Sequence, residues 1–142
     1  MELLLICRDA LENSIIGNLL VALEEKKAGA DVGILFTQEA LASLAGQSLD
    51  WSPLFRDRDT RAKIAKNAKS MGIPLAHAKD ARQTDTYQLL KAAKEAGVNL
   101  MACPAWTALL GIQERLPGEL TKVDSAATLK CLKEAKRVIG TF

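Results

Sequence analysis

Short apolar runs alternate along the chain with segments whose apolar residues recur at helical spacing. The runs at residues 2–7, 32–36, 98–102 and 138–142 are typical of buried strands, because they carry apolar residues on both faces. A further candidate strand, residues 73–76, is weakened by Pro74, which has no N–H for a sheet hydrogen bond.

The segments between these runs predict helices. In the first, Asp9 and Glu12 have the spacing of a capping box, an apolar stripe follows, and Gly29 closes the helix. A later helix begins where Asp124 or Ser125 caps a segment that runs through Leu129 and Leu132. The other predicted helices cover residues 38–45, 60–71, 87–96 and 104–110.

This order of strands and helices predicts one α/β domain over residues 1–142. The expected architecture has three layers, with a mostly parallel central sheet and helices on both faces. In such sheets, ligands and reactive groups gather outside the carboxyl ends of the strands. Cys7, Thr37 and Cys103 each stand at the end of a predicted strand. If the strands that end at Cys7 and Cys103 are close in the sheet, both thiols border one crevice.

Cys103 is the main candidate for chemistry, because a helix is predicted to start directly after it. Pro104 suits the first turn of that helix, where its missing N–H would have no partner anyway. Cys103 therefore falls near the N-cap, where the positive end of the helix dipole favours a thiolate, the reactive form of cysteine. The alternative is that Cys103 is simply a small buried apolar residue.

The other two cysteines are weaker candidates. The neighbouring Arg8 can stabilise a thiolate or an anionic sulfur species at Cys7, but the favoured interpretation of Cys7 is a buried strand-end cysteine, since free cysteines are often simply buried. A redox pair of Cys7 and Cys103 requires their α-carbons to be close, which sequence does not decide. Cys131 lies within a predicted helix and is interpreted as structural.

The segment from Gln47 to Asp59 is predicted to be an exposed loop, because serine, aspartate, proline and arginine dominate it. Trp51, Leu54 and Phe55 are apolar exceptions within it. They either pack back onto the domain or meet another subunit, and the loop either covers the crevice or joins subunits.

Composition excludes several classes of function. The net charge is only +2 and both signs are scattered, so neither a nucleic-acid surface nor a basic membrane patch is expected. No run is long enough to span a bilayer and no signal peptide is evident, so we expect a cytoplasmic protein. One histidine and three cysteines without a CxxC spacing give no metal site, and no glycine-rich nucleotide loop is present, so no cofactor is expected.

Three stretches of the chain resemble the DsrE/DsrF-like family, the small α/β proteins of sulfur-relay and sulfur-oxidation systems, and in particular its "peroxiredoxin-like" DsrE branch. Residues 30–37 resemble the family's second strand, which ends in Phe-Thr, and residues 96–103 resemble its Gly-Val-x-Leu-x-Ala-Cys strand. Gly111 and Ile112, with a leucine, a proline and a glycine after them, resemble the downstream segment. The resemblance implies a flavodoxin-like sandwich and places Cys103 on the family's sulfur-carrying cysteine.

The resemblance also implies partners. Cys103 would accept sulfane sulfur as a persulfide from a donor protein and pass it to an acceptor, and the protein would form a homo-oligomer, a trimer or a hexamer. Independently of the family's motifs, the charge of Arg8 suggests that it would help to hold the anionic sulfur. Pro104 and Trp106 depart from the family's pattern, in which smaller or polar residues are expected after the cysteine, and would reshape the pocket.

The leading hypothesis from sequence is therefore a sulfur carrier, a possible sulfurtransferase, with Cys103 as the reactive group. One alternative is a non-catalytic subunit of the same fold that binds a small ligand or a protein. The other is a thiol-redox protein that uses Cys7 and Cys103.

Overall fold

The computed structural model describes residues 1–140 and contains one five-stranded sheet in which every strand pairing is parallel. The strands stand in the order β4-β3-β2-β1-β5. Their bounds are β1 Leu3–Cys7, β2 Val32–Phe36, β3 Asn99–Ala102, β4 Thr121–Lys122 and β5 Arg137–Gly140. The predicted α/β class with a parallel central sheet is confirmed.

Six α-helices and two 3-10 segments occur within the described residues. The helices are α1 Glu12–Lys27, α2 Gln38–Gly46, α3 Arg58–Ser70, α4 Thr86–Glu95, α5 Pro104–Leu110 and α6 Ser125–Glu134. The 3-10 segments are Pro53–Phe55 and Gln113–Arg115. None of the described helices is both long enough and apolar enough to cross a membrane.

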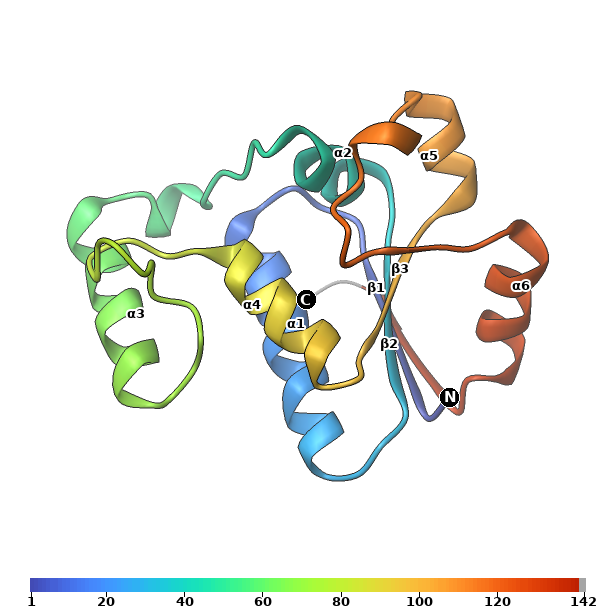
Figure 1. The fold of residues 1–142 in the computed structure, drawn as a ribbon, viewed down its shortest axis with the longest axis horizontal. Coiled ribbons are helices and arrows are strands. Elements are labelled where there is room, and N and C mark those ends of the chain that lie inside the picture. The colour runs from blue at the N-terminus through green and yellow to red at the C-terminus, as the bar shows by residue number, and fades with distance from the viewer. Residues whose placement is uncertain (141–142) are drawn as a thin grey trace.

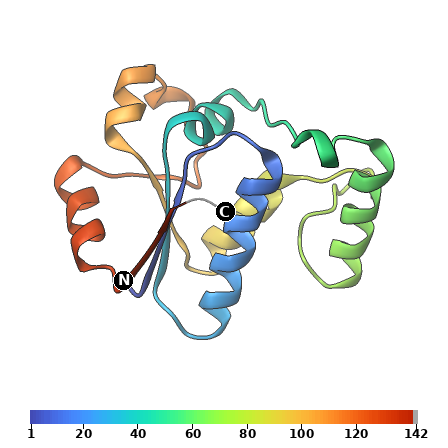
Figure 2. The ribbon, with the colours of Figure 1, turned by 180° about the vertical axis from the view of Figure 1, so that it is seen from behind.

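The two faces of the sheet are covered unequally. Helices α1 and α4 pack on one face, and α3 stands farther out on the same side (Figure 1). Helix α6 lies on the other face, and α2 and α5 lie at the carboxyl edge of the strands, as the reverse view also shows (Figure 2). This arrangement produces a large core under α1 and α4, and a small one under α6 that is centred on Leu4, Leu35 and Met101.

The chain order explains why the layers differ. From β1 to β4 the strands are added in one direction, and the chain then returns through α6 to place β5 on the other side of β1. Right-handed crossovers put helices on opposite faces when the direction of strand addition reverses. The strand order thus reverses between β1 and β5, whereas Cys103 follows β3, two strands away from β1.

Several predicted element ends require correction. Asp9 does not form a capping box, because its Oδ1 accepts the N–H of Leu11 at 3.0 Å; α1 begins at Glu12, after Leu11 as N-cap. Residues 73–76 form no strand, and only an isolated bridge joins Ala76 to Thr84. β4 was not predicted, since two exposed polar residues carry no apolar pattern.

The last predicted strand is present but shifted, since β5 begins at Arg137 and the final residues 141–142 lie outside the described part of the chain. Helix α3 begins two residues earlier than predicted, because Asp57 caps it by accepting the N–H of Thr60 at 2.9 Å. The predicted helix over Pro104–Leu110 is confirmed with the same bounds, and Gly111 ends it with a φ of 63°.

The large core predicts where a substitution is costly. Leu89 of α4 is fully buried in it, whereas Met71, just after α3, is 72% exposed. Leu89→Ala should lower the free energy of unfolding by about 2–5 kcal/mol, because it removes buried contacts and leaves a cavity. Met71→Ala should change it by less than about 0.5 kcal/mol. Urea unfolding followed by circular dichroism measures both, and equal effects would contradict this assignment of the core.

Candidate functional site

Cys103 occupies the position expected from the sequence, at the carboxyl end of β3 and the N-cap of α5. Its backbone is held on both sides: the N–H donates to the carbonyl of Phe36 at 2.9 Å, and the carbonyl accepts the Thr107 N–H at 3.0 Å. The hydroxyl of Thr107 donates to the same carbonyl at 2.7 Å. The side chain is half-buried and not part of a disulfide. The fold therefore fixes the backbone of Cys103 and leaves its thiol partly accessible.

Cys7 has a different environment. It ends β1 with 1% of its surface exposed, within the core under α1. Burial, together with the smaller effect of the nearby charge of Asp9, raises the pKa of the Cys7 thiol to about 12. Cys7 is therefore a neutral thiol at physiological pH, which does not suit it for nucleophilic chemistry.

β2 separates the two thiols. In the sheet register Cys7 pairs with Phe36, and Phe36 pairs with Ala102, the residue before Cys103. Two strand spacings amount to about 9–10 Å, beyond the roughly 7 Å that a disulfide can bridge between α-carbons. The condition for a Cys7–Cys103 redox pair is not met without movement of the backbone, and Cys7 does not open to a shared crevice.

The other predicted site residues lie along the same edge of the sheet. The Thr37 N–H donates to the carbonyl of Cys7 at 3.0 Å, and the Ala40 N–H donates to the carbonyl of Arg8 at 2.9 Å, so the ends of β1 and β2 are joined. Thr37 is buried, whereas the Arg8 side chain is exposed. Pro104 is half-buried and Trp106 is 36% exposed, both on α5.

Gln38, which sequence reasoning missed, lies at this edge with unusual backbone geometry. Its φ is 52°, in the left-handed region that costs a non-glycine residue energy, and it directly follows Thr37 at the start of α2. Strain of this kind persists where the surrounding structure enforces it, and it is common at functional sites. The strand end beside Cys103 is therefore locally strained, and the residue type alone gave no signal of it.

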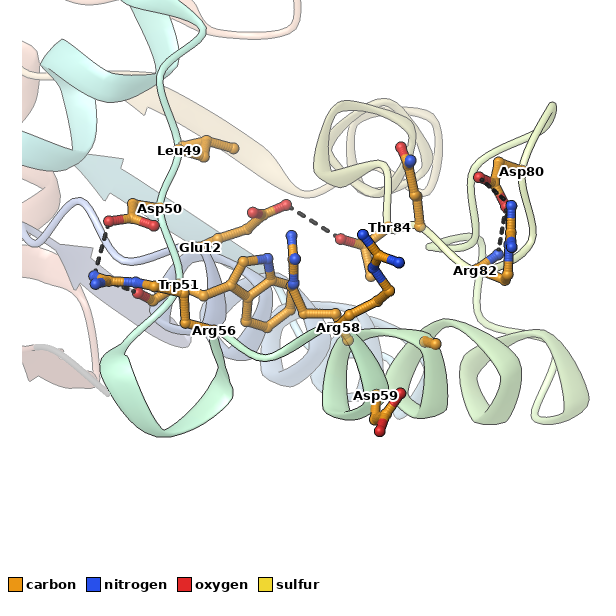
Figure 3. Close-up of a pocket in the computed structure, with 13 residues that line it drawn as sticks. Glu12, Leu49, Asp50, Trp51, Arg56, Arg58, Asp59, Asp80, Arg82 and Thr84 are labelled. Carbon is orange, nitrogen blue, oxygen red and sulfur yellow. Dashed lines mark hydrogen bonds and ion pairs between the residues drawn. The ribbon is translucent and has the colours of Figure 1, made fainter.

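A second candidate site is a cavity of about 790 Å³ beside the first turn of α1, which contains none of the site residues predicted from sequence. It is formed by α1, α3, the segment from Gln47 to Asp59 and the loop before α4 (Figure 3). Four arginines and four acidic residues are prominent among its lining residues, which are Glu12, Leu49, Asp50, Trp51, Arg56, Arg58, Asp59, Arg61, Ala62, Asp80, Arg82, Gln83 and Thr84. In the sequence, the closely spaced arginines of residues 56–61 are the signal that could have pointed to this site.

The Gln47–Asp59 segment is attached to the start of α1 by hydrogen bonds. The Glu12 N–H donates to the carbonyl of Asp50 at 2.7 Å, and the Ser52 N–H donates to Oδ1 of Asn13 at 2.9 Å. Trp51 is only 5% exposed, and Phe55 packs partly against the same core, whereas Leu54 is 81% exposed. The segment therefore packs onto its own domain and forms a wall of the cavity.

No group of three or more His, Cys, Asp or Glu side chains within residues 1–140 is arranged to hold a metal ion. In the two candidate sites, the groups best suited to hold a ligand are the thiol of Cys103 at the sheet edge and the arginines of the cavity.

Together, the parallel sheet and the strand-end cysteine define the chain as an α/β protein of the flavodoxin-like type with a thiol at its carboxyl edge. Its fold is that of the ychN protein from E. coli, with a TM-score of 0.62 at 14% sequence identity over 99% of this chain and 98% of that one. It is also similar to BT1422, a conserved protein of unknown function from Bacteroides thetaiotaomicron, with a TM-score of 0.57 at 12% identity over 98% and 93% of the two chains. No family model and no curated protein matches the sequence. These neighbours establish the fold, which is consistent with the resemblance to DsrE/DsrF-like proteins.

The different environments of the thiols predict different reactivity. With iodoacetamide at mildly alkaline pH, the half-buried Cys103 should be alkylated in the folded protein, because its thiol is accessible. Cys7 should react only after denaturation in urea, because it is buried and its pKa is about 12. Peptide mapping by mass spectrometry gives the extent at each site. Alkylation of Cys7 at the rate of Cys103 in the folded protein would contradict this assignment.

Proposed function

We propose that the protein is a sulfur carrier of the DsrE/DsrF-like type, which accepts sulfane sulfur as a persulfide on Cys103 and passes it to a partner protein. The observation that carries the proposal is the placement of an accessible thiol at the carboxyl end of a central parallel strand, at the start of a helix. The unpaired N–H groups of a first helical turn favour negative charge, which a thiolate and a persulfide anion both carry. The sequence resemblance to DsrE/DsrF-like proteins supports the same function, and the fold shared with the ychN protein is consistent with that resemblance.

The transfer needs no external oxidant. The Cys103 thiolate attacks the outer sulfur of a donor persulfide, and an S–S bond forms between Sγ and that sulfur. The S–S bond within the donor breaks, and its electron pair leaves with the donor's remaining sulfur as a thiolate. In the delivery step, an acceptor thiolate attacks the outer sulfur of the Cys103 persulfide, and Cys103 leaves as a thiolate. Arg8 is exposed and follows β1, two strands from the β3 end that carries Cys103, and its long cationic side chain would help to balance the negative charge.

The alternative, a non-catalytic ligand-binding subunit, is favoured by one observation, the arginine-lined cavity that contains no thiol. A dithiol redox function has less support, because β2 separates Cys7 from Cys103.

Sulfur loading tests the proposal directly. The reduced protein is incubated with polysulfide, or with thiosulfate and a sulfurtransferase, and its intact mass and cysteine peptides are recorded. Wild type and Cys7→Ser should gain one sulfur atom that maps to Cys103, and Cys103→Ser should gain none there. Cys131→Ser is the matched control, since Cys131 is also half-buried. If Cys103→Ser took up as much sulfur as the wild-type protein, the proposed carrier function would be wrong.

The proposed function includes assembly into a trimer or hexamer. Large apolar side chains are exposed on α5 and α6, which contact each other: Trp106, Leu109 and Leu110 on α5, and Leu129 and Leu132 on α6. Exposed apolar residues on neighbouring elements are typical of interaction surfaces. Burial of this surface between copies would place subunit contacts beside Cys103, which precedes α5.

Light scattering after gel filtration tests this assembly. Wild type should have the mass of three or six chains, and the double variant L109E/L129E should shift toward a monomer, because it places two charges in the apolar contact. Met71→Glu, at a residue exposed elsewhere on the molecule, should leave the mass unchanged. A monomeric wild-type protein would contradict the predicted assembly.

A further inference from the structure

The cavity beside α1 has the size and the polar groups of a small-molecule site. Its volume of about 790 Å³ lies within the range of roughly 300–1,000 Å³ that ligand pockets occupy. Its wall is held in place before any ligand arrives, because the carbonyl of Asp50 and the N–H of Ser52 form hydrogen bonds with the backbone of Glu12 and the side chain of Asn13 in the first turn of α1. Such preorganisation reduces the entropy that binding costs.

Half of the charged side chains that line the cavity are already paired. Arg56 forms an ion pair with Asp50 at 3.0 Å and also donates to the carbonyl of Trp51 at 3.4 Å. Arg82 forms an ion pair with Asp80 at 3.2 Å. These two pairs neutralise two of the arginines and two of the carboxylates.

Of the remaining acidic groups, Asp59 is exposed on α3 and points away from the other labelled side chains (Figure 3). Glu12 faces Thr84, and it accepts hydrogen bonds from the hydroxyls of Thr86 at 2.7 Å and of Thr84 at 3.3 Å. Burial raises the pKa of Glu12, while these two hydrogen bonds and the charge of Arg61 act against that rise. The carboxylate of Glu12 is therefore held mainly by hydroxyl groups.

Arg58 and Arg61 remain as cations without a close partner. Within residues 1–140 neither forms an ion pair, although Arg61 is near enough to Asp57 and Glu12 to help lower the pKa of each. Their spacing of three residues places them on the same side of α3. The cavity lining as a whole holds four arginines and four carboxylates, but two ion pairs use two of each and Asp59 points away (Figure 3), so among the described lining residues Glu12 is the carboxylate left beside Arg58 and Arg61.

Arg61 also provides a direct sign of an absent partner. Its Nε is buried and has no hydrogen-bond acceptor among the described residues. A buried donor without an acceptor is costly, and native proteins rarely leave one unsatisfied. Guanidinium groups bind phosphate and carboxylate oxygens in bidentate pairs, so an oxyanion in the cavity would supply the acceptor if the Arg61 side chain turned its Nε toward the cavity.

We propose that this cavity binds a small organic phosphate, whose phosphate group is held by Arg58 and Arg61 and whose organic part contacts Trp51 and Leu49. A phosphate monoester fits better than a monocarboxylate, because its two negative charges match two unpaired guanidinium groups. The site holds no cysteine and lies apart from Cys103, so it adds a binding function to the proposed sulfur transfer and does not depend on it.

Fluorescence of Trp51 reports on the site. The chain has two tryptophans, so Trp106→Phe leaves Trp51 as the only one. Phenyl phosphate and inorganic phosphate are titrated into this variant at constant ionic strength, with sodium chloride as the reference and calorimetry as a second readout. Phenyl phosphate should bind saturably and more tightly than inorganic phosphate, because only its ring contacts the apolar wall.

Substitutions test which residues of the cavity bind the phosphate. Arg58→Gln and Arg61→Gln should each weaken phenyl phosphate binding about 10-fold or more, the size expected from the loss of a charged hydrogen-bond donor. Glu12→Gln should tighten it, because it removes the opposing charge and keeps an acceptor for the threonines. Arg115→Gln, the same change outside the cavity, should have no effect.

Two results would overturn the proposal: no saturable binding of phenyl phosphate by either method, or binding that R58Q/R61Q retains at full strength. Phenyl phosphate that binds no more tightly than inorganic phosphate would overturn the role of Trp51 and Leu49. Thermal unfolding checks that each variant is folded. Sulfur loading of Cys103 should be unchanged in R58Q/R61Q, so failure of the phosphate site and failure of sulfur transfer are distinguishable.

Discussion

The pairing of β2 with β1 and β3 is the interaction on which the site at the sheet edge depends. Phe36, the last residue of β2, pairs with Cys7 on one side, and its carbonyl accepts the N–H of Cys103 on the other. These backbone bonds hold the ends of three strands level, so Cys7, Thr37 and Cys103 reach the same edge. They also keep β2 between the two thiols. The same pairing that gathers the candidate residues therefore favours chemistry at one thiol over exchange between two.

The unequal layers give the two ends of this edge different surfaces. On the side of α1 and α3, charged residues surround a cavity, and two of its arginines form no ion pair with any residue that the structure describes. On the side of α5 and α6, exposed tryptophan and leucine side chains lie next to Cys103. A charged cavity is suited to a small anion, and an apolar surface is suited to a protein. The fold thus separates the surface proposed for macromolecular contact from the one proposed for a small ligand.

The parts of the fold that could be predicted from sequence are those with a strong local pattern. Continuous apolar runs marked β1 and β2, and Pro104 and Gly111 marked both ends of α5. The short polar strand β4 has no such pattern, since its place comes from pairing with β3. The cavity could not be predicted either, because Glu12, Arg58 and Arg82 are far apart in sequence and meet only after folding. An aspartate such as Asp9 can either cap a helix or form a short turn with the residue two positions later. The sequence predicted the cap, but in the structure Asp9 accepts the N–H of Leu11 in a turn.

Cys103 illustrates how a rigid backbone can serve a transferable group. Its N–H is bound to Phe36, and its carbonyl is bound to both the N–H and the hydroxyl of Thr107, so the thiol is the group left for chemistry. Addition of a sulfur atom to Sγ would change neither of these backbone interactions. A carrier must bind sulfur firmly enough to hold it but release it when the acceptor arrives. In the proposed function, a half-buried thiol on a fixed backbone would meet both needs, because the protein would shield part of the persulfide while its outer sulfur stayed within reach of a partner's thiolate.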